Sequence, residues 1–468
     1  MVKLRRLVVI LGPVLGLTVL GLIILSMTLG WWDGRGRRSI TELTERVFYS
    51  PANSWLTFYR TRAPAGTGWV HLPDVKEAAA FRSEIDPALR GYLPPSVCAE
   101  CHAEQAEKFS ETAHYLTSMP ASRQTILGSF APGKNRLDTQ DPHLYFEMVE
   151  EEGQLFQCVR IQQQGQEYEH RRPFDLVIGS GNHGQTYLYW ERDQLYQLPI
   201  SYFSESGWIN SPGLYRDGTA DFARDVGARC LDCHATYFAS EPNRYNGYDA
   251  SNYMLGVTCV RCHGPGWAHV QYHRTHPEDQ TGRYLVHPGE LSAVRANEIC
   301  AQCHSGVGVP LQPPFTYRPG EPLDQFIELD MNQDDPQNDD PHAANQLLRL
   351  MKSKCFQESE SLTCVTCHDP HRDERGQMEV FAKRCGKCHE KDACRLSAAH
   401  GDRLATRCVE CHMPSRRDQE GAMQTPAGAL LPLLRDHLIQ RSSEATAQVL
   451  NELGKAAAPA SQPIPDES

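Results

Sequence analysis

The sequence predicts a mainly α-helical protein with much irregular coil, a small antiparallel β insertion and one N-terminal transmembrane helix. Three observations support this prediction. A Cys-x-x-Cys-His pattern recurs seven times, starting at Cys98, Cys230, Cys259, Cys300, Cys364, Cys385 and Cys408. Residues 140–205 alternate apolar and polar positions, as strands do. Residues 7–32 carry no charged side chain.

The repeated pattern is the attachment signature of c-type haem, in which two thiols bind the porphyrin and the adjoining imidazole binds the iron. Zinc knuckles, the alternative, need paired cysteines but no histidine at a fixed offset, and all seven pairs have it. The sequence therefore predicts seven covalently attached haems c. The expected attachment residues are Cys98, Cys101, Cys230, Cys233, Cys259, Cys262, Cys300, Cys303, Cys364, Cys367, Cys385, Cys388, Cys408 and Cys411. The expected proximal iron ligands are His102, His234, His263, His304, His368, His389 and His412.

The composition agrees with a chain that packs against large cofactors. Its mean hydropathy is −0.49 and 40% of its 468 residues are hydrophobic, so a conventional apolar core would be thin for this length. Short helices and loops wrapped round a stack of seven haems would supply further apolar surface. The formal net charge of −12 argues against a nucleic-acid partner and favours a basic redox partner.

The N-terminal apolar stretch is long enough to span a bilayer and longer than the apolar region of an ordinary signal peptide. Trp31 and Trp32 lie where an interfacial aromatic belt would fall. We expect an uncleaved signal anchor, with a cleaved signal as the alternative. Because the haem motifs must be exported, we expect the protein on the periplasmic side of the bacterial inner membrane. The expected parts are the anchor (1–32), a juxtamembrane segment (33–90), a heptahaem domain (91–440) and a C-terminal helix with a disordered tail (441–468).

Within the expected haem domain, the first motif opens a helix from Cys98 to His114. His114 would then lie about 18 Å along the helix axis from His102 and would ligate a neighbouring haem. The β insertion has two strand pairs, at 144–149 with 155–161 and at 186–190 with 194–200. His183 lies on a glycine-flanked loop before the second pair, and it either ligates a haem or is solvated.

Two further histidines are constrained by their distance from a motif. His371 is three residues from His368, with Pro370 between them, so His371 cannot reach the opposite face of the haem on its own motif. The same argument applies to His269, which follows His263 across a Gly-Pro-Gly turn. Each of the two would therefore ligate a neighbouring haem and tie two haems together.

Five runs of sequence resemble a known family: residues 179–188 (GSGNHGQTYL), 262–266 (CHGPG), 362–371 (LTCVTCHDPH), 411–414 (CHMP) and 436–439 (DHLI). Over most of residues 95–440 the chain resembles periplasmic multihaem c-type cytochromes related to cytochrome c-554 and hydroxylamine oxidoreductase. The resemblance implies distal ligation by His269 and His371 and, at less closely matching positions, by His342 and His437. Residues 416–434 lack a histidine that similar sequences often carry, which would leave one haem open.

Three cysteines lie outside the motifs: Cys158, Cys355 and Cys394. Because haem attachment takes place in an oxidising compartment, where disulfides persist, Cys355 and Cys394 either form a disulfide or stay as two separate buried thiols.

We expect an electron-transfer protein that carries electrons between the membrane quinol pool, or a respiratory complex, and redox partner proteins. One alternative is an oxidoreductase that acts on a small nitrogen or sulfur compound, such as nitrite or hydroxylamine, at a five-coordinate haem. A structural conduit within a larger respiratory complex is a third. No Cys-x-x-Cys-Lys motif is present, so the lysine-ligated haem of related nitrite reductases is absent. The sequence leaves open whether the chain is an enzyme.

Overall fold

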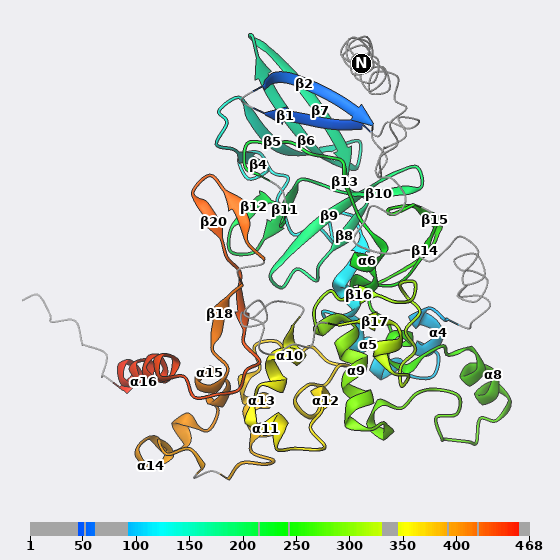
Figure 1. Cartoon of the computed structure of the whole chain (residues 1–468), viewed down its shortest axis with the longest axis vertical. Coiled ribbons are helices and arrows are strands. Elements are labelled where there is room, and N and C mark those ends of the chain that lie inside the picture. The colour runs from blue at the N-terminus through cyan, green and yellow to red at the C-terminus, as the bar shows by residue number, and fades with distance from the viewer. Residues whose placement is uncertain are drawn as a thin grey trace, which may run out of the picture.

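The computed structural model describes residues 45–50, 53–60, 92–213, 216–241, 244–329, 345–390, 393–418 and 421–457. Figure 1 shows a β-rich part at one end of the molecule and a part built from short helices at the other. Most of the Cys-x-x-Cys-His turns lie in the helical part. The two parts differ in what forms their core, since paired sheets fill the first, whereas the helices of the second are too short to bury a large apolar face.

Four antiparallel strands form one sheet of the β-rich part, in the order β4 (Arg136–Asp138), β5 (Leu144–Glu151), β6 (Gln154–Gln163) and β7 (Gln166–Pro173). Burial alternates along β5, where Leu144, Phe146 and Met148 face the core. This alternation is the sequence pattern that predicts the strand, because successive side chains of a strand point to opposite faces. The turn to β6 places Glu152 and Gly153 in the left-handed region, at φ values of 52° and 80°.

A seven-stranded sheet lies next along the chain. Its main path is β12 (Gly207–Asn210), β11 (Ile200–Phe203), β9 (Gly184–Glu191), β10 (Gln194–Gln197) and β13 (Arg224–Asp225). The strand β8 (Leu176–Ile178) pairs with β9 and with β3 (Ser118–Pro120). Through β3 the sheet holds the segment that follows the first motif, so the first motif is tied to a strand register and not only to loops.

The sheet is joined to the second motif by a shared apolar cluster. The helix α6 (Ala228–His234) carries this motif, and its Leu231 is buried with Leu188 of β9 and Phe238 of β14 (Ala235–Ser240). Buried aromatic and aliphatic side chains contribute most of the stability of such a contact. The β-rich part therefore fixes the position of α6.

The other motifs lie on short helices or single turns in the lower half of Figure 1. In chain order the α-helices of this part are α4 (Pro95–Ala99), α5 (Ala103–Ser110), α7 (Val260–His263), α8 (Trp267–Thr275), α9 (Ala293–His304), α10 (Gln346–Met351), α11 (Lys354–Gln357), α12 (Cys364–Cys367), α13 (Met378–Cys385), α14 (Ser397–His400) and α15 (Cys408–His412). The last helix, α16 (Ser443–Ala457), follows the seventh motif. Single-turn 3-10 helices fill several connections, among them η1 (Tyr115–Thr117), η2 (Pro288–Glu290), η3 (Leu323–Gln325) and η6 (Gly401–Leu404).

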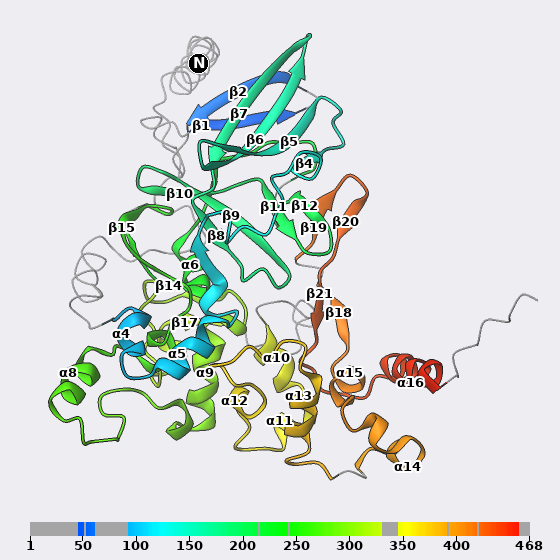
Figure 2. The ribbon, with the colours of Figure 1, turned by 180° about the vertical axis from the view of Figure 1, so that it is seen from behind.

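A two-part arm connects the seventh motif to the β-rich end, as Figures 1 and 2 both show. Its lower part pairs β18 (Ser415–Arg417) with β21 (Leu433–Arg435), and its tip pairs β19 (Met423–Thr425) with β20 (Gly428–Leu430). The Asn210 side-chain amide of β12 donates to the Gln424 carbonyl at 3.0 Å. The arm thus brings together residues that are 214 positions apart in sequence.

The prediction of a mainly α fold is wrong. Strands and helices hold comparable shares of the described residues. The expected strand pairs between residues 140 and 205 correspond to β5, β6, β9 and β10, but pairing continues well beyond them. Further two-stranded sheets are β1 (Glu45–Ser50) with β2 (Asn53–Arg60), β14 with β15 (Tyr248–Leu255), and β16 (Val309–Pro310) with β17 (Ile327–Glu328). Most motif helices contribute only four to eight residues, which is why the motif count overstated the helix content.

Two expected helices also need correction. The helix predicted from Cys98 to His114 ends at Ser110, and a break at the first motif separates α4 from α5. His114 instead precedes η1, so a distance along one helix axis does not describe its position. The predicted transmembrane helix is not part of the described fold. None of the helices in the described ranges is both long and apolar enough to cross a membrane, and residues 7–32 lie outside those ranges.

Candidate haem-binding sites

Each site begins with a helical turn that puts both thiols and the imidazole on one side. In the motifs starting at Cys98, Cys259, Cys364 and Cys385, the histidine N–H donates to the carbonyl of the first cysteine at 2.9–3.0 Å. Residues i, i+3 and i+4 of such a turn share one face. This is the arrangement that two thioether bonds and one proximal iron ligand need.

Four of the motif imidazoles face a second imidazole from a distant part of the chain. The ring centroids are 6.3 Å apart for His102 and His269, 6.2 Å for His114 and His304, 6.1 Å for His263 and His371, and 6.1 Å for His368 and His437. A metal–imidazole bond of about 2.0 Å on each side of one iron atom gives a centroid separation of about 6 Å. The paired side chains therefore fit a haem iron held between them.

The paired histidines come from segments that are distant in the sequence. A histidine that follows one motif faces the histidine of a different motif. His371 faces the third motif, although it follows the fifth motif directly. In the same way His269 faces the first motif although it follows the third. Both placements have the geometry expected from the short tethers, in which a histidine close to one motif reaches the haem of another.

Hydrogen bonds at Nδ1 orient several of these rings. Nδ1 of His263 and of His269 lies 2.9 Å and 2.8 Å from the carbonyl oxygens of Val286 and Arg283. His437 Nδ1 lies 3.2 Å from the Arg435 carbonyl. Because a carbonyl only accepts, Nδ1 must carry the proton in each case, which leaves the Nε2 lone pair for a metal.

Burial keeps the most enclosed imidazoles neutral. It lowers the pKa of His114, of His234 and of His437 to about 4 in each case. An imidazole binds iron only through a neutral nitrogen, so burial keeps these residues in the ligating form at neutral pH.

Thiols of different motifs touch one another. Cys98 contacts Cys259, Cys233 contacts Cys303, and Cys300 contacts Cys364. The hydrogen bond from Cys259 lowers the pKa of the Cys98 thiol to about 7, and the same contact raises the pKa of Cys259. The first motif therefore lies beside the third, the second beside the fourth, and the fourth beside the fifth.

Some predicted ligands are not brought together. His183 is exposed on its loop, and its carbonyl accepts from Ser204 N–H at 3.0 Å. Within the part of the chain that the structure describes, no histidine ring faces His183, His234, His389 or His412 at the separation of the four pairs. His342 lies outside the described residues.

The structure also shows the state of the three cysteines outside the motifs and bears on the alternative of zinc binding. Cys355 and Cys394 are both free thiols, the first partly buried and the second exposed, so the structure shows neither a disulfide between them nor two buried thiols. Cys158 is buried in β6, and burial raises its pKa to about 12. Across the described ranges, no three His, Cys, Asp or Glu side chains converge in the manner of a zinc site.

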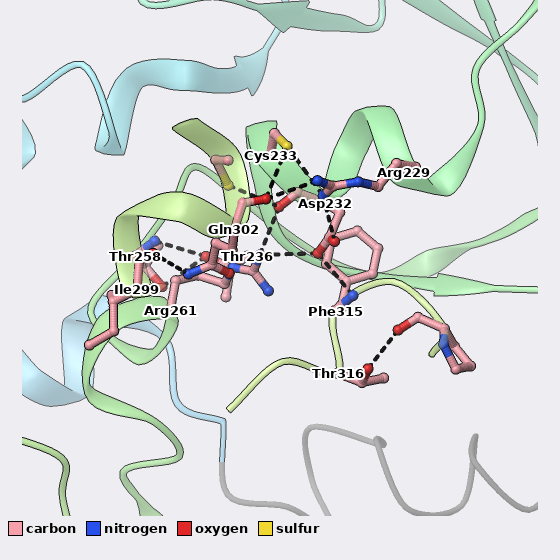
Figure 3. Close-up of polar contacts among 12 residues, drawn as sticks. Arg229, Asp232, Cys233, Thr236, Thr258, Arg261, Ile299, Gln302, Phe315 and Thr316 are labelled. Carbon is pink, nitrogen blue, oxygen red and sulfur yellow. Dashed lines mark hydrogen bonds and ion pairs between the residues drawn. The ribbon is translucent and has the colours of Figure 1, made fainter. Parts of the chain in front are cut away.

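Residues that the motif pattern does not single out support these sites. Thr117 Oγ1 lies 3.0 Å from Nδ1 of His234, and Gln346 Oε1 lies 3.0 Å from Nδ1 of His304. Charged residues between the cysteines of a motif form a buried cluster with their neighbours (Figure 3). The only sequence signal for the cluster is a charge at a position that usually tolerates any residue, as in Asp232 and Arg261.

The cysteine turns and the paired imidazoles define a class of protein, one that holds haem of the c type. A family model agrees, since residues 214–264 match the family described as cytochrome c554 and c-prime. This segment contains the second and third motifs. It supports a c-type cytochrome relationship, covalently bound haem and electron transfer. No curated protein and no solved structure gives a match.

Proposed function

We propose that the chain is a multihaem electron-transfer protein with seven covalently held haems c. The observation that carries the proposal is the set of four imidazole pairs at 6.1–6.3 Å. Haem held at such a site would supply a one-electron redox centre, and because an imidazole of the chain would hold the iron from each side, the site suits electron transfer better than substrate binding. The chain contributes the ligands, their orientation and their burial.

The contacts between motifs support transfer along the molecule. Beyond the three thiol contacts, Arg384 of α13 donates to the Cys367 carbonyl at 2.7 Å. The same helix ends at Cys385, the first cysteine of the sixth motif, and packs against α15 of the seventh. Each motif is thus held against at least one other motif, so that neighbouring redox centres would be close.

We also propose an extracytoplasmic location and a basic redox partner protein. The attachment chemistry of the seven motifs supports the location, and the net charge of −12 supports the partner. We propose the electron donor and acceptor by chemical class: a one-electron redox protein or a quinol.

The test uses the full chain made in a host that attaches c-type haem. Under denaturing conditions its mass should exceed that of the polypeptide by seven haems. Electron paramagnetic resonance of the oxidised protein at low temperature should show mainly low-spin iron. A polypeptide without covalent haem would overturn the proposal. A high-spin signal that shifts on adding nitrite or hydroxylamine would favour an oxidoreductase instead.

A further inference from the structure

The middle residues of three motifs meet in one buried cluster, drawn in Figure 3. Arg229 and Asp232 lie on α6 with the second motif, and Arg261 lies between the two cysteines of the third. Gln302 occupies the same position in the fourth motif, on α9. The exposed fractions of the Arg229, Asp232 and Arg261 side chains are 5%, 9% and 4%. The cluster therefore lies at the junction of the motifs and out of water.

Asp232 is the centre of the cluster. Its Oδ2 accepts from Arg229 at 3.0 Å, and its Oδ1 accepts from Arg261 at 3.0 Å and from the Phe315 N–H at 2.9 Å. Arg229 also donates to the carbonyls of Gln302 and Val307, at 2.9 Å and 2.8 Å. These bonds fix the two guanidinium groups on either side of one carboxylate.

The charges do not cancel. Two guanidinium groups, which stay protonated in proteins, share one carboxylate, so the cluster holds one net positive charge. Coulomb interactions are strong at such a site because burial reduces screening by water and salt. A buried ion pair by itself is weak evidence for stabilisation. A cluster that only held the motifs together would not need an excess positive charge.

The excess charge lies beside the attachment atoms. Arg229 Nη1 is 3.4 Å from Cys233 Sγ, and this sulfur is itself 4.0 Å from the Gln302 carbonyl. Reciprocally, Cys303 Sγ is 4.0 Å from the Asp232 carbonyl. When a ferric centre takes up one electron from a redox partner, no bond changes and the site gains one negative charge. A fixed positive charge nearby favours the reduced state.

We propose that Arg229, Asp232 and Arg261 form an electrostatic element that raises the reduction potentials of the centres attached at the second, third and fourth motifs. The three residues act through the field at the sites and not as ligands. This inference rests on the proposed function, because it requires haem at these motifs. Its consequence is that electrons collect at the centres of the second, third and fourth motifs, which lie between the first motif and the fifth, sixth and seventh.

The test is a potentiometric titration of the holoprotein, followed by its visible absorbance at fixed pH. Asp232→Asn removes the negative charge with little change in shape and should shift part of the reduction curve to higher potential. Arg261→Gln removes a positive charge and should shift part of it to lower potential, whereas Arg261→Lys should stay near the wild type. Arg318→Gln is the control, because Arg318 is 49% exposed and forms a surface ion pair with Glu321.

Opposite shifts for the two charge-removing variants are the signature of the field. Shifts in the same direction, or unchanged curves in variants that keep all their covalent haem, would overturn the proposal. If Arg261→Gln loses haem, the near-isosteric Asp232→Asn still decides, because an unchanged or lowered potential in that variant contradicts the inference. A wild-type chain without covalent haem would instead contradict the proposed function.

Discussion

At the scale of single residues, the candidate iron ligands have the two properties that ligation requires. The rings of His263, His269 and His437 donate Nδ1–H to carbonyls, so Nε2 is free. His437 is also kept neutral by burial. Loss of one member of a pair should therefore open one face of one haem and leave the others unchanged.

We predict that His371→Ala converts one haem to the high-spin state, and that this haem belongs to the third motif. The reason is that His371 faces His263, whereas His437 faces His368. The double variant His371→Ala with His437→Ala should then show twice the high-spin signal by electron paramagnetic resonance. His183→Ala is the control and should keep the wild-type spectrum. If the double variant gave only one high-spin haem, both histidines would serve the same site.

At the scale of elements, a buried ion pair joins α10 to the segment that follows β21. Arg349 Nη2 lies 2.7 Å from Asp436 Oδ2, and the two side chains are 1% and 2% exposed. Ser353 Oγ contacts the His437 carbonyl at 3.3 Å and the Ile439 N–H at 2.8 Å. The contact between α10 and the segment after β21 thus fixes the backbone on both sides of His437, and with it the position of the His437 ring.

The pair also predicts a pH dependence of stability. Burial alone would raise the pKa of Asp436, but hydrogen bonds from Arg349 and from the Leu438 N–H outweigh it and lower the pKa below the usual 3.8. A carboxyl group with a lowered pKa in the folded state stabilises the protein above its unfolded pKa and loses this contribution as the pH falls through its folded value. The free energy of unfolding should therefore fall as the pH is lowered below about 4.

Denaturant titrations at a series of pH values check this prediction. Asp436→Asn should be less stable than the wild type at pH 7, and the difference should shrink as the pH approaches the folded pKa. Glu444→Gln, on the first turn of α16, is a surface control that should follow the wild type. A difference between Asp436→Asn and the wild type that stayed constant with pH would show that the Asp436 carboxyl does not contribute through its charge.

At the scale of the whole molecule, the net charge of −12 should govern encounters with small redox reagents. A cationic oxidant such as hexaammineruthenium should react faster at low ionic strength, and an anionic one such as ferricyanide more slowly. Raising the salt from about 0.01 M to about 1 M shortens the Debye length from about 30 Å to about 3 Å and should bring the two rates together. Stopped-flow mixing measures both. If the two rates changed with salt in the same way, the exposed haem edges at which the reagents exchange electrons would lie away from the acidic side chains that give the net charge.

The parts of the fold and of the candidate haem sites that could be predicted from the sequence are those whose pattern lies in adjacent residues. The cysteine turns and the strands β5 and β6 follow from spacing and alternation, which adjacent residues carry. The identity of each imidazole pair does not, because His114 and His304 come together only through the strands and helices between them. The cluster around Asp232 was missed for the same reason, since a single charged residue between the cysteines of the second motif and of the third forms no periodic pattern. The helix expected from Cys98 failed because the chain turns at the first motif.

The arm that follows the seventh motif has a consequence for assembly. Arg349 and Asp436 are 87 positions apart, and the arm tip reaches a strand 214 positions earlier. Such contacts give a high contact order, and proteins of this kind fold more slowly than those built from local contacts. During synthesis from the N-terminus, the ring that faces the fifth motif emerges only after the seventh motif has been made. The interior of the molecule is therefore closed last by its C-terminal segment, and until then the iron at the fifth motif would be open to small molecules on one side.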